Sequence, residues 1–316
     1  MTKKLISLLL VLVLALSLVA CSNGDDKKTE EKPAETATET NTEEKTEEKT
    51  EEQAPEASNE PITVISREDG SGTRGAFIEI TGIEEKDGDT KVDRTTVDAV
   101  VQKSTNAVLM TVNGDKNAIG YISLGSLNDS VKAAKVEGVE ASADNVLDGS
   151  YKIARPFNIV YKGEADGLKK DFIDFMMSKE GQEMVLENKY VQVDTAAAEY
   201  KQNSQSGKLV VGGSTSVTPL MEKFAEKYME MYPDVKIEIQ STGSSAGIQA
   251  AIEGAADLGM ASRDLSDEEK AELTNVVIAK DGIAVIVNND NAVDDLSLEQ
   301  IKAIFVGETK TWGDIK

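Results

Sequence analysis

The 316-residue sequence contains no histidine and a single cysteine, Cys21. Without histidine the chain lacks the side chain that most often acts as a general acid or base near neutral pH. Without a second cysteine it cannot form an intrachain disulfide, and the usual zinc ligand sets and histidine-activated nucleophiles are also absent. We therefore expect no metal site, no cofactor and no enzyme, although carboxylate chemistry alone is not excluded.

Positive charge is also scarce, because 34 lysines and arginines stand against 57 aspartates and glutamates, a formal net charge of −23. Residues 61–316 hold −16 of this charge. Nucleic acids and anionic lipid surfaces are therefore unlikely partners, since the overall field repels them. Any small anion that the chain binds must be held by local donors.

The first residues predict an export signal. Lys3 and Lys4 precede an apolar run from Leu5 to Ala20, which is shorter than the roughly 20 residues that a membrane-spanning helix needs. We assign residues 1–20 to a signal peptide. The ending Leu-Val-Ala-Cys resembles the lipobox of bacterial lipoproteins, which implies acyl chains such as palmitate on Cys21 and a membrane anchor. A chance cysteine is the alternative.

Residues 21–60 predict a disordered acidic tether. Beyond Cys21 this segment carries 14 acids and 5 lysines with almost no large apolar side chain. It cannot bury enough apolar surface to offset the entropy of ordering. As a flexible coil it would span about 35 Å.

The remaining sequence alternates β-rich runs with amphipathic stretches, which predicts an α/β fold. The first strand-to-helix junction has a strand at 62–66, a polar turn, and a helix from near Thr73 with Ala76, Phe77 and Ile80 on one face.

Two more junctions have the same composition. A strand at 208–211 leads through a Gly-Gly-Ser-Thr-Ser turn to a helix whose start is marked by Pro219. A strand at 235–240 leads through Ser-Thr-Gly-Ser-Ser to a helix through Ile248. The apolar residues of the second helix are Leu220, Phe224, Tyr228 and Met231.

Glycine, serine and threonine at a helix N-terminus suit a small anion. The first N–H groups of a helix have no intrahelical acceptor, and the helix dipole favours negative charge there. A single turn of this kind is more often an ordinary N-cap, whereas three such turns that converge on one ligand would indicate an anion site. A fourth segment, 257–265, predicts a short strand ending in Ser262 and Arg263, where the arginine either binds an oxyanion or forms a surface ion pair.

These segments resemble the phosphate-binding proteins of high-affinity phosphate ABC transporters. The resemblance covers nearly all of residues 61–316, and R-E-D-G-S-G-T at 67–73 is its most specific block. The other blocks are G-S-T-S-V-T-P-L at 213–220, G-S-S-A-G-I at 243–248, G-M-A-S-R-D-L at 259–265, G-Y-I-S-L at 120–124, Y-K-I-A-R-P-F at 151–157, I-F-V-G-E at 304–308 and W-G-D-I at 312–315.

The order of the blocks differs from the usual family order, in which G-S-T-S-V comes first. A circular permutation would produce this order, with the two ends of the folded region meeting in space. A truncated product of tandem copies is the alternative.

The resemblance implies a two-lobed periplasmic-binding-protein-like fold of type II, whose lobes close about a hinge. Mapped onto this order, one lobe comprises residues 61–155 plus 288–316, and the other comprises residues 156–287.

The resemblance also implies the ligand-binding residues. Asp69 is expected to orient Arg67 and to accept the hydrogen bond of a protonated ligand, which would favour phosphate over sulfate. Some family members carry an acidic residue at the position of Arg263, so this chain departs from the pattern there. The expected phosphate-binding residues are Arg67, Asp69, Ser71, Gly72, Thr73, Ser214, Thr215, Ser216, Val217, Thr218, Ser244, Ser245, Ser262 and Arg263.

The expected function is capture of inorganic phosphate by a monomeric lipoprotein, anchored on the extracytoplasmic face of a Gram-positive type cell membrane, and delivery to an ABC transporter permease. Three alternatives stay open: a binder of another oxyanion such as sulfate, molybdate or tungstate, a phosphate sensor or other surface lipoprotein, and, less consistent with the missing histidine, a phosphatase.

Overall fold

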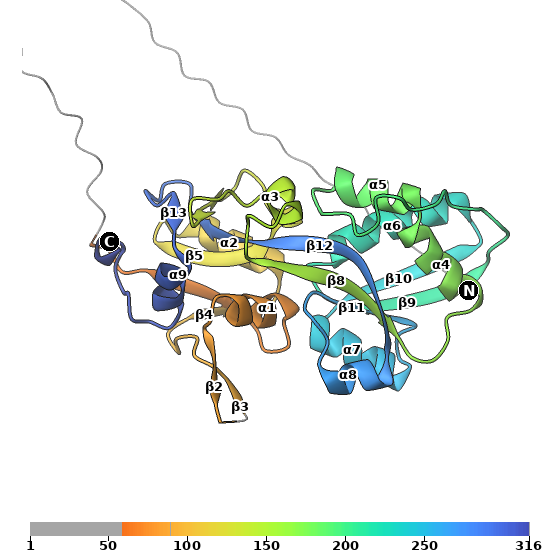
Figure 1. Cartoon of the computed structure of the whole chain (residues 1–316), viewed down its shortest axis with the longest axis horizontal. Coiled ribbons are helices and arrows are strands. Elements are labelled where there is room, and N and C mark those ends of the chain that lie inside the picture. The colour runs from red at the N-terminus through yellow and green to blue at the C-terminus, as the bar shows by residue number, and fades with distance from the viewer. Residues whose placement is uncertain (1–58, 89, 316) are drawn as a thin grey trace, which may run out of the picture. The chain divides into compact units, whose positions relative to one another are not determined.

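The computed structural model describes residues 59–88 and 90–315 (Figure 1). The predicted signal peptide, the predicted lipidation of Cys21 and nearly all of the predicted tether lie outside these residues. In the described part of the chain, no helix has both the length and the apolar character needed to cross a membrane.

The strands of this part form one nine-stranded mixed sheet and two small ones. The large sheet has the order β10-β9-β11-β8-β12-β5-β1-β4, and β6 pairs with β12. Its strands are β1 (Thr63–Arg67), β4 (Val100–Gln102), β5 (Ala118–Ser123), β6 (Lys132–Ala133), β8 (Ala154–Tyr161), β9 (Gly207–Gly213), β10 (Val235–Ser241), β11 (Leu258–Ala261) and β12 (Thr274–Val287). The small sheets pair β2 (Glu84–Asp87) with β3 (Thr90–Asp93) and β7 (Lys135–Val136) with β13 (Asp295–Leu296).

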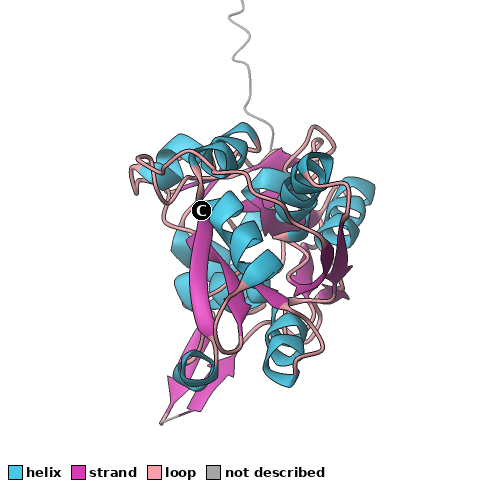
Figure 2. Ribbon diagram, turned by 90° about the vertical axis from the view of Figure 1, so that its right-hand side faces the viewer, coloured by secondary structure: helices cyan, strands magenta, loops and turns pink. Residues whose placement is uncertain are grey.

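Helices lie on both sides of the strands (Figure 2). They are α1 (Gly72–Ile80), α2 (Thr105–Gly114), α3 (Ala143–Leu147), α4 (Gly167–Met177), α5 (Lys179–Glu187), α6 (Thr218–Met231), α7 (Ser244–Glu253), α8 (Asp267–Glu272) and α9 (Leu298–Phe305), with 3₁₀ turns at Leu124–Ser126 and Trp312–Asp314.

Two sets of helices pack on two different parts of the large sheet. Helices α4, α5 and α6 cover one face of β8 to β11, and α7 covers the other face. Helices α1, α3 and α9 cover one face of β1, β5 and the end of β12, and α2 covers the other face. Phe172, Ile173, Phe175 and Met176 of α4 lie in the first of these cores.

The long antiparallel strands β8 and β12 run between the two groups (Figure 1). In β12, residues 274–282 pair with β8, whereas residues 283–287 pair with β5. Between residues 282 and 283, β12 therefore passes from the strands covered by α4, α5 and α6 to the strands covered by α1, α3 and α9. This is a few residues before the predicted lobe boundary after residue 287. The change follows Lys280, Asp281 and Gly282, which interrupt the apolar run of this strand. The assignment of the two lobes stays a prediction.

The two ends of the described region lie side by side. The amide of Ile62 donates to the carbonyl of Lys310 at 2.8 Å, and Pro61 forms an isolated bridge with Thr311. Trp312 is buried next to them in the core of α1 and α9. This adjacency is the geometry that a permuted order requires, and the permutation itself stays a prediction.

Candidate functional site

Three helices begin directly after strand ends, as the junction sequences predicted. Ser71 is the N-cap of α1 and its side chain accepts from the amide of Arg74 at 3.4 Å. Helix α6 has proline in its first turn. Helix α7 follows Gly243, whose φ of 97° favours glycine. The helix N-termini therefore lie at the strand ends, although some of their amides are bonded within the protein, since the amide of Thr218 donates to the carbonyl of Ser214 at 3.1 Å.

The hydroxyls of these turns meet in one buried group. We call Thr73, Ser214, Ser216, Ser244 and Ser262 the hydroxyl cluster; each of them is at most 2% exposed. Thr73 Oγ1 lies 2.8 Å from Ser216 Oγ, and Ser214 Oγ donates to Ser262 Oγ at 2.8 Å. Ser244 Oγ lies 3.4 Å from Ser262 Oγ and accepts from the Ser262 amide at 3.1 Å. Four separate segments of the sequence therefore converge.

Gly72 brings the turn of α1 into contact with the turn of α7. A Cβ atom at residue 72 would lie 2.3 Å from Ser244 Oγ and 2.7 Å from Ser262 Oγ. The amide of Ser245 also donates to the carbonyl of Gly70 at 3.0 Å. No larger residue fits at position 72 without displacing the hydroxyl cluster.

Arg67 lies beside this cluster, and it is only 1% exposed. Its Nη2 donates to Thr215 Oγ1 at 3.0 Å, and its amide donates to the hydroxyl of Tyr121 at 3.2 Å. Its Nη1 is buried and has no hydrogen-bond partner among the described residues. A buried guanidinium nitrogen without a partner is costly, so a bound oxyanion would satisfy it.

The carboxylate that orients Arg67 is Glu68 and not Asp69, so the predicted role of Asp69 is corrected. Glu68 accepts from Arg67 Nε at 2.8 Å and from Nη2 at 2.9 Å. The Asp69 side chain is 97% exposed and pairs with Arg74 at 2.9 Å. Asp69 points outward because it begins the turn at Gly70, whose φ is 83°. In this structure Asp69 lies outside the hydroxyl cluster.

Arg263 lies at the edge of the cluster, where a surface partner satisfies it. Its Nη1 donates to Glu269 Oε2 at 2.7 Å and its Nη2 to Glu269 Oε1 at 2.8 Å. A hydrogen bond from Arg263 to Glu269 lowers the pKa of that carboxyl. The structure therefore shows the ion pair that the sequence offered as an alternative, with Glu269 as the partner.

The remaining predicted residues surround the cluster in different ways. Val217 is buried in the core beneath α6, and Thr218 Oγ1 donates to the carbonyl of Ser214 at 2.9 Å. Ser245 is exposed and contributes its amide to Gly70. The structure thus gathers the hydroxyl cluster with Gly72, Arg67 and Thr215, places Ser71 next to Gly72 as the N-cap of α1, and leaves the side chains of Asp69, Thr218, Ser245 and Arg263 outside the cluster.

A buried ion pair below the cluster was missed by the sequence reasoning. Arg155 of β8 and Asp281 of β12 lie 3.0 Å apart and are almost completely buried. Arg155 Nη1 also donates to the carbonyl of Ser262 at 3.1 Å, and Asn158 donates to the carbonyl of Arg263 at 2.8 Å. Burial raises the pKa of Asp281 to about 6, against the opposing effect of Arg155. These crossing strands therefore hold the 262–263 turn in place.

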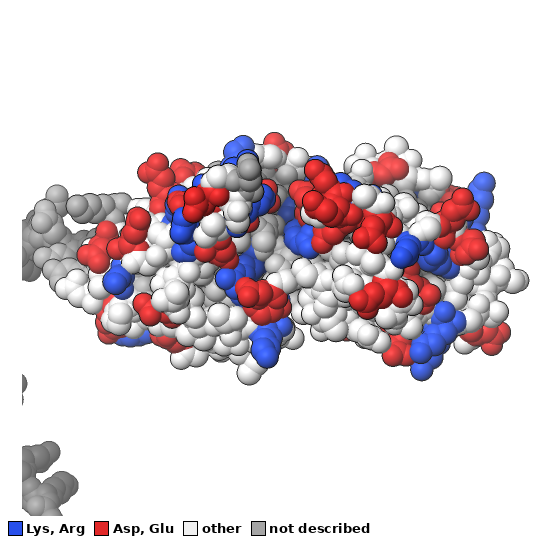
Figure 3. Space-filling model, turned by 90° about the horizontal axis from the view of Figure 1, so that it is seen from below, with Lys and Arg blue, Asp and Glu red and all other residues white. Residues whose placement is uncertain are grey.

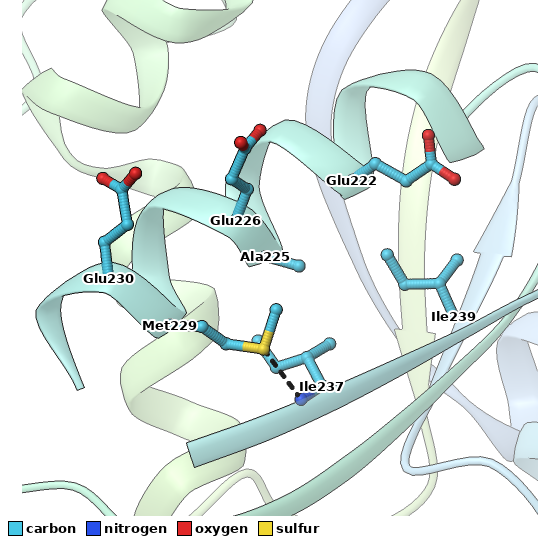
Figure 4. A pocket seen from close by; sticks show the side chains of 7 residues that line it. All are labelled: Glu222, Ala225, Glu226, Met229, Glu230, Ile237 and Ile239. Atoms are coloured by element: carbon cyan, nitrogen blue, oxygen red, sulfur yellow. Dashed lines mark hydrogen bonds between the residues drawn. The ribbon is translucent and has the colours of Figure 1, made fainter. Parts of the chain in front are cut away.

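Two other surfaces of the described region lack the donors that would suit an anion. A hollow between α6 and β10 has an apolar floor, and three carboxylates of α6 lie along it (Figure 4). The face shown in Figure 3 carries acidic side chains with basic ones between them and no broad basic area. No group of three or more metal-ligating side chains occurs in residues 59–88 and 90–315.

Comparisons with known proteins agree with this geometry. A family model described as a PBP superfamily domain matches residues 38–180 and 198–315. Phosphate-binding protein PstS 2 of Streptococcus pneumoniae serotype 4 is 49% identical over 261 residues, which cover 83% of this chain and 90% of that protein. Phosphate-binding protein PstS 2 of Streptococcus agalactiae serotype V is 51% identical over 263 residues, which cover 82% of this chain and 89% of that protein.

A solved structure agrees as well. The crystal structure of a phosphate-binding protein of a phosphate ABC transporter from Streptococcus pneumoniae TIGR4 is 55% identical, with a TM-score of 0.67. The match covers 81% of this chain and 100% of that chain. The predicted family and the predicted binding-protein fold are thus confirmed. The chain belongs to the PBP superfamily and, within it, to the PstS family of phosphate-binding proteins.

Proposed function

We propose that this protein captures inorganic phosphate outside the cytoplasm and delivers it to the permease of an ABC transporter. The observation that carries the proposal is the convergence of the hydroxyl cluster and the unpartnered Nη1 of Arg67 at the N-termini of α1, α6 and α7. Its relatives of about 50% identity are named phosphate-binding proteins, which supports the same ligand here.

The donors match a tetrahedral oxyanion. Hydroxyls and first-turn amides donate hydrogen bonds from several directions, and Arg67 adds a charge-assisted bond. Local donors of this kind bind an anion even though the domain carries a net charge of −16. The proposal includes no catalytic residue and no metal.

The contacts between the two groups of helices support a closing motion. Arg67 Nη2 and Thr73 Oγ1 belong to the segment around α1, and they bond Thr215 and Ser216 at the start of α6. Opening about β8 and β12 would break these bonds and expose the hydroxyl cluster. We propose that phosphate takes over these bonds when the lobes of residues 61–155 plus 288–316 and 156–287 close.

The location and assembly belong to the same proposal. Lipidation of Cys21 would hold the protein at the outer face of the membrane, and residues 21–60 would let the binding domain reach the permease. A single binding domain needs no second copy for this task, so we propose a monomer.

Isothermal titration calorimetry of the purified protein with phosphate, sulfate and arsenate tests the proposed ligand. We expect saturable binding of phosphate at one site per chain, tighter than the binding of sulfate. Tight sulfate binding without phosphate binding would support the alternative of another oxyanion. No binding of any of the three anions would contradict the proposal.

A further inference from the structure

A fourth helix begins beside the hydroxyl cluster, at a junction that the sequence reasoning missed. Strand β4 ends at Gln102, and α2 starts at Thr105 with Ser104 as its N-cap, whose Oγ accepts from the amide of Ala107 at 3.1 Å. The three predicted junctions contain glycine, whereas residues 103–106 do not. We infer that Thr105 donates a hydrogen bond to the bound phosphate, so that α2 contributes to the same site as α1, α6 and α7. This inference rests on the proposed function and extends it by one ligand-binding residue.

Three buried hydroxyls meet where α2 approaches the start of α6. Thr105 is 4% exposed, Thr73 1% and Ser216 0%. Ser216 Oγ lies 2.8 Å from Thr73 Oγ1 and 3.4 Å from Thr105 Oγ1. The second distance is longer than the usual separation of about 2.7–2.8 Å between two hydrogen-bonded hydroxyl oxygens. The contact of Thr105 with Ser216 is therefore the weaker of the two.

This group of three hydroxyls has more donors than acceptors within the protein. Each hydroxyl carries one hydrogen, so the three side chains have three, and their two mutual contacts use at most two of them. Among the described residues, none of the three hydroxyls forms another hydrogen bond. At least one buried O–H group is therefore left without an acceptor from the protein, which costs free energy unless a bound molecule supplies one. A phosphate oxygen is an acceptor of this kind.

Helix α2 also starts beside the guanidinium of Arg67. The carbonyl of Gln102 accepts from Arg67 Nε at 3.3 Å, and Arg67 Nη2 donates to Thr215, the neighbour of Ser216, at 3.0 Å. The remaining nitrogen, Nη1, is the buried donor without a partner among the described residues. The unpartnered nitrogen and the surplus hydroxyl hydrogen therefore belong to groups that both border the turn at 215–216. One oxyanion at this turn would accept from both, and the N-terminus of α2 would favour its negative charge.

Calorimetry with phosphate tests the role of Thr105. Thr105→Val keeps the shape of the side chain and removes the hydroxyl, so we expect the phosphate Kd to rise on the order of tenfold, because a hydrogen bond to a charged ligand is lost. Thr105→Ser retains the hydroxyl and should keep the Kd within about threefold of that of the unchanged protein. Thr81→Val is the matched control: Thr81 is 6% exposed and its hydroxyl donates to the carbonyl of Phe77 at 2.6 Å, away from the cluster, so its loss should leave the Kd unchanged.

A crystal structure of the phosphate complex is the second measurement, and it should place Thr105 Oγ1 within about 3.0 Å of a phosphate oxygen. The inference is wrong if the Kd of Thr105→Val stays within about threefold of that of Thr81→Val, or if Thr105→Ser loses as much affinity as Thr105→Val. A Thr105 hydroxyl more than about 4 Å from every phosphate oxygen would overturn it as well. Should Thr105→Val fail to fold by circular dichroism, Thr105→Ser and the crystal structure decide in its place. Failure of the unchanged protein to bind phosphate would instead overturn the proposed function, and this inference with it.

Discussion

Arg67 and Arg263 both lie beside the hydroxyl cluster, and both form a bidentate pair with a glutamate, yet their surroundings differ. Arg67 is 1% exposed and retains a buried nitrogen without a partner. Arg263 is partly exposed, and both of its terminal nitrogens are used by groups of its own turn and of α8. We therefore expect Arg67, and not Arg263, to contribute to phosphate binding, because Arg67 retains a buried donor without a partner among the described residues.

Replacing Arg67 should give the largest effect. In Arg67→Ala we expect phosphate affinity to fall by about 2–4 kcal/mol, because a buried charge-assisted donor is lost and Glu68 is left to repel the anion. Calorimetry measures the affinity, and circular dichroism verifies that the fold is intact. Affinity within about threefold of that of the unchanged protein would show that Arg67 does not bind phosphate. The structural difference between Arg67 and Arg263 would then have no consequence for binding.

Gly72→Ala tests whether phosphate binding and stability require the close approach of the α1 turn to Ser244 and Ser262. The new Cβ would overlap Ser244 Oγ and Ser262 Oγ, so we expect both weaker phosphate binding and a loss of about 1–3 kcal/mol in the free energy of unfolding. Gly114→Ala is the matched control, because a Cβ at that helical glycine meets nothing within 4 Å. Denaturant unfolding of both variants gives the measurement; equal stability would contradict the overlap.

Ser71→Ala should have an intermediate effect. It removes the N-cap of α1 and a hydroxyl of the most specific motif, so we expect about tenfold weaker phosphate binding with about 1 kcal/mol lower stability. Ser142→Ala, which removes the N-cap of α3 far from the cluster in sequence, should lower stability without changing affinity. If both variants bind phosphate equally well, the Ser71 hydroxyl has no role in the site.

Arg263→Ala should have the smallest effect. Arg263 and its partner Glu269 are partly exposed, at 21% and 19%, and their side chains lie outside the hydroxyl cluster, so we expect phosphate affinity to change by less than about threefold. The pair also predicts a pH dependence, because Arg263 lowers the pKa of Glu269 in the folded state. The stability from this pair is present above the unfolded pKa of glutamate, about 4.3, and is lost as the pH falls through the lower folded pKa.

Thermal unfolding of Arg263→Ala and of the unchanged protein at several pH values tests the predicted direction of this pH dependence. The difference in Tm should be greatest near neutral pH and should shrink below about pH 4. A difference that grows in acid would show that Arg263 acts through another group.

Much of the fold followed from local sequence patterns. The predicted strands at 62–66, 208–211 and 235–240 correspond to β1, β9 and β10 within two residues at each end. Glycine and hydroxyl residues were predicted to donate at the following helix N-termini, and the structure brings those residues together. These features can be predicted from the sequence because turns and helix N-termini depend on residues that are neighbours in the chain.

The ion pairs could not be predicted from the local sequence in the same way. Glu68 and Asp69 are adjacent acids of similar chemistry, and only the turn at Gly70 decides which one faces Arg67. Arg155 and Asp281 are 126 positions apart, so nothing local indicated that they form one buried pair. Arg155 lies within the Y-K-I-A-R-P-F block at 151–157. Its place in that block is the one feature of the sequence that could have drawn attention to it.

The composition of the hydroxyl cluster also limits how the protein can respond to acidity. Serine and threonine hydroxyls and backbone amides do not gain or lose protons between pH 5 and 8, and the sequence has no histidine to do so. The donor array that meets the ligand is therefore the same in mildly acidic and mildly alkaline surroundings. Across that range, the groups that change protonation are the captured anion and, below the cluster, the Asp281 carboxyl, whose pKa burial raises to about 6.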